Sequence, residues 1–226
     1  MLTRLDWMGQ HVDVISTWKD NDKVEEYVGR VARLAARAAG DAELIEVLPE
    51  VCERVLDLGC GDGRLIELVV GARPRVVDAI GLDSSPPMIE RARNRFVDDP
   101  RVTVMEHDLE SPVPDLGTFD VIVSGFAIHH LSHERKQSLF TEVAASLRPG
   151  GVFANLEVVQ CATPELQEEF YRRIERPGGD PEDVLAMVHE QLQWMRTAGL
   201  VQVDCFWRWR GFALLVGQAV GEAPHR

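Results

Sequence analysis

The sequence predicts an α/β protein built on a doubly wound, mostly parallel sheet that ends in an antiparallel hairpin. Three observations support this fold class. Beyond residue 50, short apolar runs alternate with segments in which apolar residues recur at helical spacing. The run 119–124 is almost continuously apolar, which is typical of a strand buried on both faces. Residues 201–218 resemble two strands joined near Arg210 and Gly211, which predicts the hairpin.

The alternating part contains five expected strands, at residues 55–58, 75–82, 102–106, 119–124 and 152–159. Helices are expected between most of these strands. The first helix follows a glycine-rich loop, and the second begins at Pro86, because proline suits the first turn of a helix. Apolar spacing places three later helices, the last with Asp180 as its N-cap, at about residues 133–147, 164–176 and 181–197.

The N-terminal part is also expected to be helical. Apolar residues recur at helical spacing from Asp22, a suitable N-cap, to about residue 38. Gly40 offers a stop, because glycine often follows the last turn of a helix. A second, short helix is then expected at about 41–48, ending before Pro49.

These elements divide the chain into an N-terminal helical segment, residues 1–49, and a main cofactor-binding domain, residues 50–226. The N-terminal segment carries large apolar side chains, among them Trp18 and Tyr27. We expect the segment to serve as a lid that excludes water from the site, with at least one of these side chains packed against the sheet.

Composition and charge narrow the class of partner. Apolar residues make up 45% of the chain and charged residues 27%, which is typical of a soluble globular domain. The 24 basic and 37 acidic side chains give a formal net charge of −13. Because a negative field repels phosphate backbones, the charge argues against a nucleic-acid partner and favours a small-molecule substrate.

Cysteine usage and the N-terminus indicate the compartment. The 4 cysteines are scattered, with no C-x-x-C pair that would indicate zinc or a redox dithiol. The first residues, M-L-T-R-L-D-W-M-G-Q, interrupt the apolar run that a signal peptide needs. No stretch approaches the roughly 20 apolar residues of a membrane span. We expect a soluble, cytoplasmic protein without a membrane partner, and nothing in the sequence indicates its oligomeric state.

The stretch from Arg54 to Arg64, R-V-L-D-L-G-C-G-D-G-R, predicts a nucleotide-like cofactor. A short strand leads into glycines at alternate positions, and glycine allows a ligand to lie against bare backbone. A helix follows at once, so that its N-terminal amides face the same ligand. The dinucleotide pattern G-x-G-x-x-G does not fit, because Arg64 occupies its third glycine position. The Lys and Ser or Thr of a phosphate-binding P-loop are missing as well.

This loop resembles motif one of the class I S-adenosylmethionine-dependent methyltransferases, and several later stretches agree in order and spacing. Asp83 ends the second expected strand, 20 residues beyond Gly63, and Asp108 follows the third in E-H-D-L. F-D-V-I-V-S-G-F-A-I-H-H-L and L-R-P-G-G are similar to the family's segments around the fourth strand and before the fifth. The resemblance covers roughly residues 50–218 and implies a Rossmann-like fold with S-adenosylmethionine as the cofactor.

The resemblance also implies a set of cofactor-binding positions. Asp57, Gly59 and Gly61 would line the methionine part. Asp83 would hold the ribose, and Ser84 beside it is a further predicted cofactor-binding position. Met88, Asp108 and Leu109 would contact the adenine, and Ser124 would lie beneath the sulfonium. Met88 also has the helical spacing of a core residue, and Gly63 is explained equally well by close packing of helix and strand.

Methyl transfer from a sulfonium is an in-line displacement, so holding donor and acceptor in place supplies much of the acceleration. A base is needed only if the acceptor must lose a proton. His129 and, second to it, His130 follow the fourth expected strand, and Glu157 lies near the end of the fifth. His129 and Glu157 are the predicted catalytic residues. His133 completes a histidine group, but an intervening loop argues against a shared metal, and no metal site is expected.

The predicted function is methyl transfer from S-adenosylmethionine to a small molecule. An RNA or protein acceptor stays open, because neither requires a universal motif. The fourth-strand segment, with Ser124 and Gly125, lacks the Asn or Asp followed by two prolines that is expected of a DNA amino-methyltransferase. A non-catalytic protein that binds S-adenosylmethionine is a further alternative, although each expected cofactor position holds a suitable residue.

Overall fold

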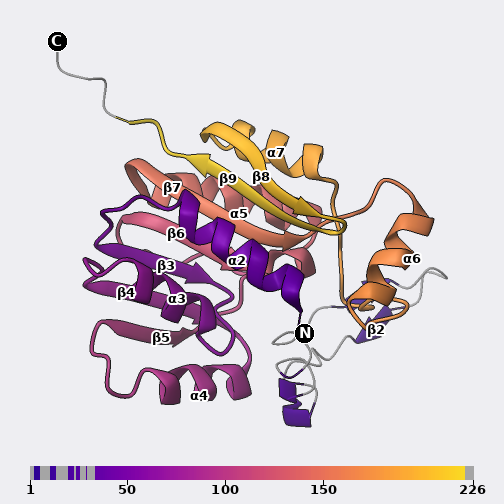
Figure 1. Ribbon diagram of the computed structural model, residues 1–226, viewed down its shortest axis with the longest axis horizontal. Coiled ribbons are helices and arrows are strands. Elements are labelled where there is room, and N and C mark those ends of the chain that lie inside the picture. Colours follow the sequence, from indigo (N-terminus) through magenta and orange to yellow (C-terminus); the bar gives the residue numbers. More distant parts are fainter. Residues whose placement is uncertain are drawn as a thin grey trace.

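The structure is a computed structural model, and it describes residues 3–5, 11–13, 20–22, 24–25, 29 and 34–221. Among these residues, 7 strands form one sheet in the order β5-β4-β3-β6-β7-β9-β8 (Figure 1). β9 runs antiparallel to β7 and β8, whereas the remaining pairs are parallel. The predicted fold class is thereby confirmed. The strands are β3 Arg54–Leu58, β4 Asp78–Asp83, β5 Val102–Glu106, β6 Phe119–Gly125, β7 Leu147–Val158, β8 Val201–Trp209 and β9 Phe212–Gln218.

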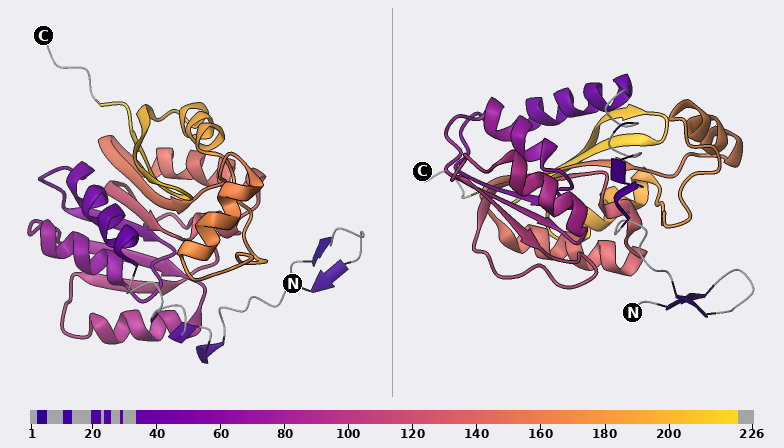
Figure 2. Two further views of the ribbon diagram at one scale, coloured as in Figure 1. Left: turned by 45° about the vertical axis from the view of Figure 1, so that its right-hand side comes forward. Right: turned by 90° about the horizontal axis from the view of Figure 1, so that it is seen from below.

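Helices cover both faces of this sheet (Figure 2). One face carries α2 Ala35–Val47, α3 Arg64–Ala72 and α4 Pro86–Arg95. The other carries α5 His133–Ser146 and α7 Val188–Thr197. Each face buries its own apolar cluster, with Ile66 at 0% exposure on the first and Phe140 at 0% on the second. This two-sided burial explains why the central strands are apolar on both faces.

Four smaller elements lie outside these layers. The helix α6, Pro164–Arg173, packs Phe170 edge-on against Phe212 at the tip of the hairpin, with ring centroids 5.0 Å apart. The short 3₁₀ helix η2, Ile128–His130, follows β6 at the carboxyl edge of the sheet. The strands β1, Thr3–Leu5, and β2, His11–Asp13, pair with each other in a separate antiparallel sheet. Among the described helices, none has both the length and the apolar character that crossing a membrane requires.

The predicted break at Gly40 is wrong, because α2 runs through it without interruption. A Cβ at this position would lie 2.8 Å from Leu156 Cδ1 and 3.0 Å from Trp207 Cζ3. Glycine is therefore required for close approach of the helix to the sheet, not for a helix stop. The predicted helix from Asp22 is also interrupted at Leu34, which has extended backbone angles and precedes α2.

The predicted start of the last helix at Pro181 is also wrong, because α7 begins only at Val188. Asp180 is not its N-cap. Instead, the Asp180 carboxylate accepts the Glu182 N–H at 3.0 Å and pairs with Arg176. Residues 181–187 thus form an irregular segment between α6 and α7. The side chains proposed for a lid, Trp18 and Tyr27, lie outside the described residues.

Candidate functional site

The glycine loop between β3 and α3 is anchored to the end of the neighbouring strand. The N–H groups of Gly59 and Cys60 both donate to the Leu82 carbonyl, at 2.8 and 2.9 Å. Gly59 and Gly61 have positive φ angles of 74° and 54°, which glycine adopts without steric cost. The loop therefore holds its backbone in a fixed conformation at the carboxyl edge of the sheet.

Each glycine of the loop has its own reason for lacking a side chain. A Cβ on Gly59 would lie 2.2 Å from the Ala127 Cβ, so the turn after β6 rests directly on the loop. A Cβ on Gly61 would meet only the Met88 Sδ, at 3.9 Å, so this glycine faces open space. A Cβ on Gly63 would lie 2.5 Å from the Phe96 ring, which favours the packing interpretation for Gly63. Gly61 thus offers the bare backbone surface that a cofactor needs.

A cavity of about 290 Å³ opens beside this loop, at the carboxyl ends of the parallel strands. Ligands bind at this edge in doubly wound sheets. The cavity is lined by all but one of the predicted cofactor residues: Asp57, Gly59, Gly61, Asp83, Ser84, Met88, Asp108 and Leu109. The exception is Ser124, whose hydroxyl is fully buried and donates to the Leu58 carbonyl at 2.8 Å, joining β6 to β3.

Asp57 presents a buried carboxyl group to this cavity. Its exposure is 0%, and neither of its side-chain oxygens makes a hydrogen bond. Burial, reinforced by the negative charge of Asp83, raises the pKa of Asp57 to about 8. A buried carboxyl without a partner is costly, so it marks a position at which a cation or donor of a ligand can bind.

Asp83, the last residue of β4, and Asp108, just after β5, also line the cavity. The two oxygens of Asp83 accept the Gly61 and Ser85 N–H groups, both at 2.8 Å. Burial raises the pKa of Asp83, although these hydrogen bonds favour its charged form. Asp108 is exposed, and its Oδ1 accepts the Glu110 N–H at 3.0 Å. Each carboxylate oxygen has a second lone pair for a ligand.

The two predicted catalytic residues lie together but do not line the cavity. His129 Nδ1 is 2.6 Å from Glu157 Oε1, and both side chains are buried. Burial lowers the pKa of His129 to about 4 and raises that of Glu157 to about 7. His130, the second histidine in the prediction, does line the cavity. Desolvation by burial lowers its pKa to about 3, so its imidazole is neutral at physiological pH.

Several lining residues were not found from the sequence. Phe126, directly after β6, has φ 59°, an uncommon left-handed conformation for a residue with a side chain. Its N–H donates to the Leu156 carbonyl at 2.8 Å, and its ring packs edge-on against Phe212 with centroids 4.8 Å apart. Arg37 of α2 lies over the same ring, 4.9 Å from its centroid. The glycine at Gly125 hints at such a turn, but no sequence pattern predicts these contacts.

The helix α2 is tied to the glycine loop by a bidentate ion pair. The Arg64 guanidinium, at the start of α3, donates to both carboxylate oxygens of Asp41 at 2.7 and 2.8 Å. Because parallel hydrogen bonds of this kind fix orientation as well as distance, they set α2 against the loop. Arg37 of the same helix lines the cavity, so part of the segment assigned to residues 1–49 forms one of its walls.

The arrangement of strand, glycine loop, acidic strand ends and cavity defines a cofactor-binding α/β domain, and comparison with known proteins identifies its class. Residues 55–151 match the family model described as a methyltransferase domain. An uncharacterised methyltransferase of Mycobacterium tuberculosis is 33% identical over 131 residues, which are 58% of this chain and 62% of the relative. The chain thus spans less than two thirds of that relative's length. Residues 55–151 of this chain are therefore a methyltransferase domain.

Two further proteins are similar to this chain. The trans-aconitate 2-methyltransferase of Methylobacterium nodulans is 34% identical over 157 residues, covering 68% of this chain and 55% of the relative. The crystal structure of human N-acetylserotonin methyltransferase in complex with S-adenosylmethionine superposes with a TM-score of 0.65. It is 14% identical and covers 90% of this chain and 57% of that one, so it supports the fold alone.

The residues present fit S-adenosylmethionine, the family's cofactor. Its methionine end carries an ammonium group, and the Asp57 carboxyl makes no hydrogen bond that would compete for it. The open side of Gly61 leaves room for a ligand against the loop. Asp83 and Asp108, which line the same cavity, supply acceptors for hydroxyl and amino groups.

Proposed function

We propose that the protein transfers the methyl group of S-adenosylmethionine to a small organic acceptor. The observation that carries this proposal is the Asp57 carboxyl, buried at the cavity beside Gly59 and Gly61 with neither oxygen hydrogen-bonded. A structural carboxyl in the interior would be paired, because an unpaired one destabilises the fold. A positively charged ligand group explains why an unpaired carboxyl lies at this position.

The proposed cofactor contacts follow from the positions around the cavity. Asp57 binds the ammonium of the methionine end, and the backbone of Gly61 lies against the same end. Asp83 and Ser84 hold the ribose hydroxyls, while Met88 packs on the adenine and Asp108 and Leu109 hold its edge. These residues all line one continuous cavity, which supports the set. Ser124 is not a contact in this proposal, because its hydroxyl is used within the sheet.

The acceptor is proposed to lie beside the turn that follows β6. This turn borders the methionine end, because Ala127 contacts the position of Gly59. Phe126, Ala127 and His130 from the turn line the cavity together with Arg37. When bound, S-adenosylmethionine supplies an electrophilic methyl group. The side chains of the turn orient the acceptor and exclude water.

A small-molecule acceptor is supported by charge and by similarity. The net charge of −13 disfavours a polyanionic RNA or DNA substrate. The name of the Methylobacterium nodulans relative specifies trans-aconitate, a small organic acid, as its acceptor. Arg37 lines this cavity, so an acceptor with an acidic group would find a complementary side chain there.

Two measurements test the proposal in order. Calorimetry with S-adenosylhomocysteine should show binding to the full chain, whereas NAD should give no heat; the reverse result would overturn the cofactor assignment. The protein is then incubated with labelled S-adenosylmethionine and a pool of metabolites of low molecular mass. A new labelled small product supports the function. Labelling confined to added RNA or protein would show that the proposed acceptor class is wrong. Cofactor binding without any turnover would show that the proposed activity is wrong.

A further inference from the structure

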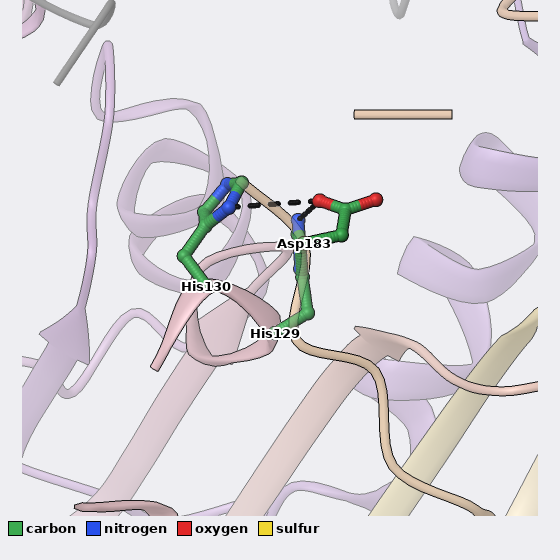
Figure 3. A group of neighbouring side chains, drawn as sticks. All are labelled: His129, His130 and Asp183. Carbon is green, nitrogen blue, oxygen red and sulfur yellow. Dashed lines mark ion pairs between the residues drawn. The ribbon is translucent and has the colours of Figure 1, made fainter. Parts of the chain in front are cut away.

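Three side chains, His129, His130 and Asp183, converge on one point, and they come from two distant stretches of sequence (Figure 3). His129 Nε2 lies 3.5 Å from Asp183 Oδ1, and His130 Nδ1 lies 3.6 Å from the same oxygen. All three atoms are within 4.8 Å of one another. Asp183 Oδ1 is buried and makes no hydrogen bond. The histidines thus aim their nitrogens at one oxygen without forming a hydrogen bond to it.

Glu157, which contacts the other ring nitrogen of His129, explains why His129 makes no hydrogen bond to Asp183. Glu157 Oε1 accepts the Val158 N–H at 2.7 Å and lies 2.6 Å from His129 Nδ1. Because this oxygen already acts as an acceptor, we assign the proton of the short contact to His129 Nδ1. The Nε2 atom of the neutral ring then carries a lone pair directed at Asp183. Two acceptors that face each other in this way leave a place for a cation.

We propose that His129, His130 and Asp183 bind a divalent transition metal ion of the zinc type. Zinc binds imidazole nitrogen and carboxylate oxygen at about 2.0–2.2 Å, so adjacent tetrahedral ligands lie roughly 3.4 Å apart. The two separations that involve Asp183 already match this value. A carboxylate that accepts the second N–H of a ligating histidine is the usual outer partner of such sites, and Glu157 occupies that position.

Hydrogen bonds outside the ligand set already hold the two segments together. The Val184 N–H donates to the His129 carbonyl at 2.8 Å, directly beside two of the proposed ligands. The fully buried Lys136 ammonium donates to the carbonyls of Leu131 and, at 2.8 Å, of Val184. Asp183 is further fixed by its N–H, which donates to the Asp180 carbonyl at 3.0 Å. Such prior ordering lowers the entropic cost of binding an ion.

Burial and charge favour a cation at this place. The side chains of His129 and Asp183 are only 8% and 10% exposed, and that of Glu157 is 0% exposed. Asp183 Oδ1 is buried without a hydrogen bond, so a divalent ion would supply the partner that this oxygen lacks. His130 is 23% exposed and lines the cofactor cavity, so ligation would also fix one of its walls.

The metal proposal is tested on the tag-free full chain after treatment with a chelator. Isothermal titration with zinc chloride should show saturable binding of about one ion per chain. Dialysed protein should retain zinc in elemental analysis, and zinc should raise the melting temperature. Magnesium, which prefers oxygen ligands, should do neither. Absence of retained zinc in the wild-type protein, or an equal response to magnesium, would overturn the proposal.

Matched variants locate the ion. Asp183→Asn and His130→Gln keep side-chain size and should each weaken zinc binding at least tenfold, and Glu157→Gln should weaken it by roughly 10-fold to 100-fold. His189→Ala, which removes an exposed histidine on α7, should bind zinc as the wild type does. S-adenosylhomocysteine binding serves as the check that each variant is folded. Undiminished zinc binding by folded Asp183→Asn would show that the ion lies elsewhere.

Discussion

Replacing Asp57 with asparagine tests the central claim about the site, because this change removes the buried charge and keeps the shape. In the unfolded chain the carboxyl ionises near its ordinary pKa of 3.8, whereas in the folded protein burial raises that pKa to about 8. Between these values the folded state holds a proton that the unfolded state has released. The contribution of Asp57 to stability is therefore complete below about pH 4 and is lost as the pH rises toward 8.

The magnitude follows from this shift. Each pH unit between the two pKa values changes the free energy of unfolding by up to about 1.4 kcal/mol, so the loss from pH 4 to pH 7 is on the order of 4 kcal/mol. Asparagine does not titrate. The stability of Asp57→Asn relative to the wild type should therefore increase by that amount over the same range, measured by urea unfolding of the cofactor-free protein.

Asp98→Asn, the same substitution at an exposed position, is the control for this series. A stability difference between Asp57→Asn and the wild type that stays constant within about 1 kcal/mol from pH 4 to pH 8 would refute the reasoning. Calorimetry adds a second readout. If Asp57 ionises against the ammonium of the ligand, S-adenosylhomocysteine should release about one proton on binding at pH 7. The heat should then depend on the buffer in the wild type and not in Asp57→Asn.

Three further substitutions test the loop, the helix contact and the ribose site. Gly61→Ala and its control Gly150→Ala both force a side chain into positive φ; the new Cβ meets only Met88 Sδ, at 3.9 Å, in the first and nothing within 4 Å in the second. Each should cost about 1–2 kcal/mol of stability, but only Gly61→Ala should reduce S-adenosylhomocysteine affinity. Gly40→Ala should destabilise the protein by about 1–3 kcal/mol in thermal unfolding, because its Cβ meets the sheet, whereas Gly71→Ala, in an open part of α3, should stabilise it by about 0.5–1 kcal/mol. Asp83→Ala should weaken S-adenosylhomocysteine binding by about 1–3 kcal/mol in calorimetry. Equal S-adenosylhomocysteine affinities for Gly61→Ala and Gly150→Ala would contradict the assignment of Gly61 to the cofactor site. Equal stabilities for Gly40→Ala and Gly71→Ala would contradict the close contact of Gly40 with the sheet. An unchanged affinity for Asp83→Ala would remove this residue from the ribose site.

Local sequence was enough for the parts of the site that one strand and its following turn create. Asp57, Gly59 and Gly61 lie within five residues of one another. The alternation of expected strands and helices places Asp83 and Asp108 at the ends of neighbouring strands. Parallel strands bring their carboxyl ends to one edge, so the sequence order of these residues already implies their proximity. The cavity lining agrees with that expectation.

Glycine and histidine were harder to interpret, because their roles depend on what packs against them. Gly40 has the sequence context of a helix stop, yet its place in α2 is decided by the side chains of β7 and β8 that press on it. The choice between His129 and His130 depends on the direction of two adjacent side chains in a short 3₁₀ turn. That turn points His129 toward Glu157 and leaves His130 at the cavity.

The sequence by itself determined the fold class, the cofactor family and the glycine loop, because these features rest on periodicity and on short motifs whose geometry is local. Only the tertiary structure decided which histidine meets the cavity and which carboxylate meets the histidines. Asp183 is more than 50 residues from His129 in sequence, within an irregular segment that has no pattern of its own. It reaches the histidines through long-range contacts, the bond from Val184 N–H to the His129 carbonyl among them, and such contacts leave no periodic trace in the chain.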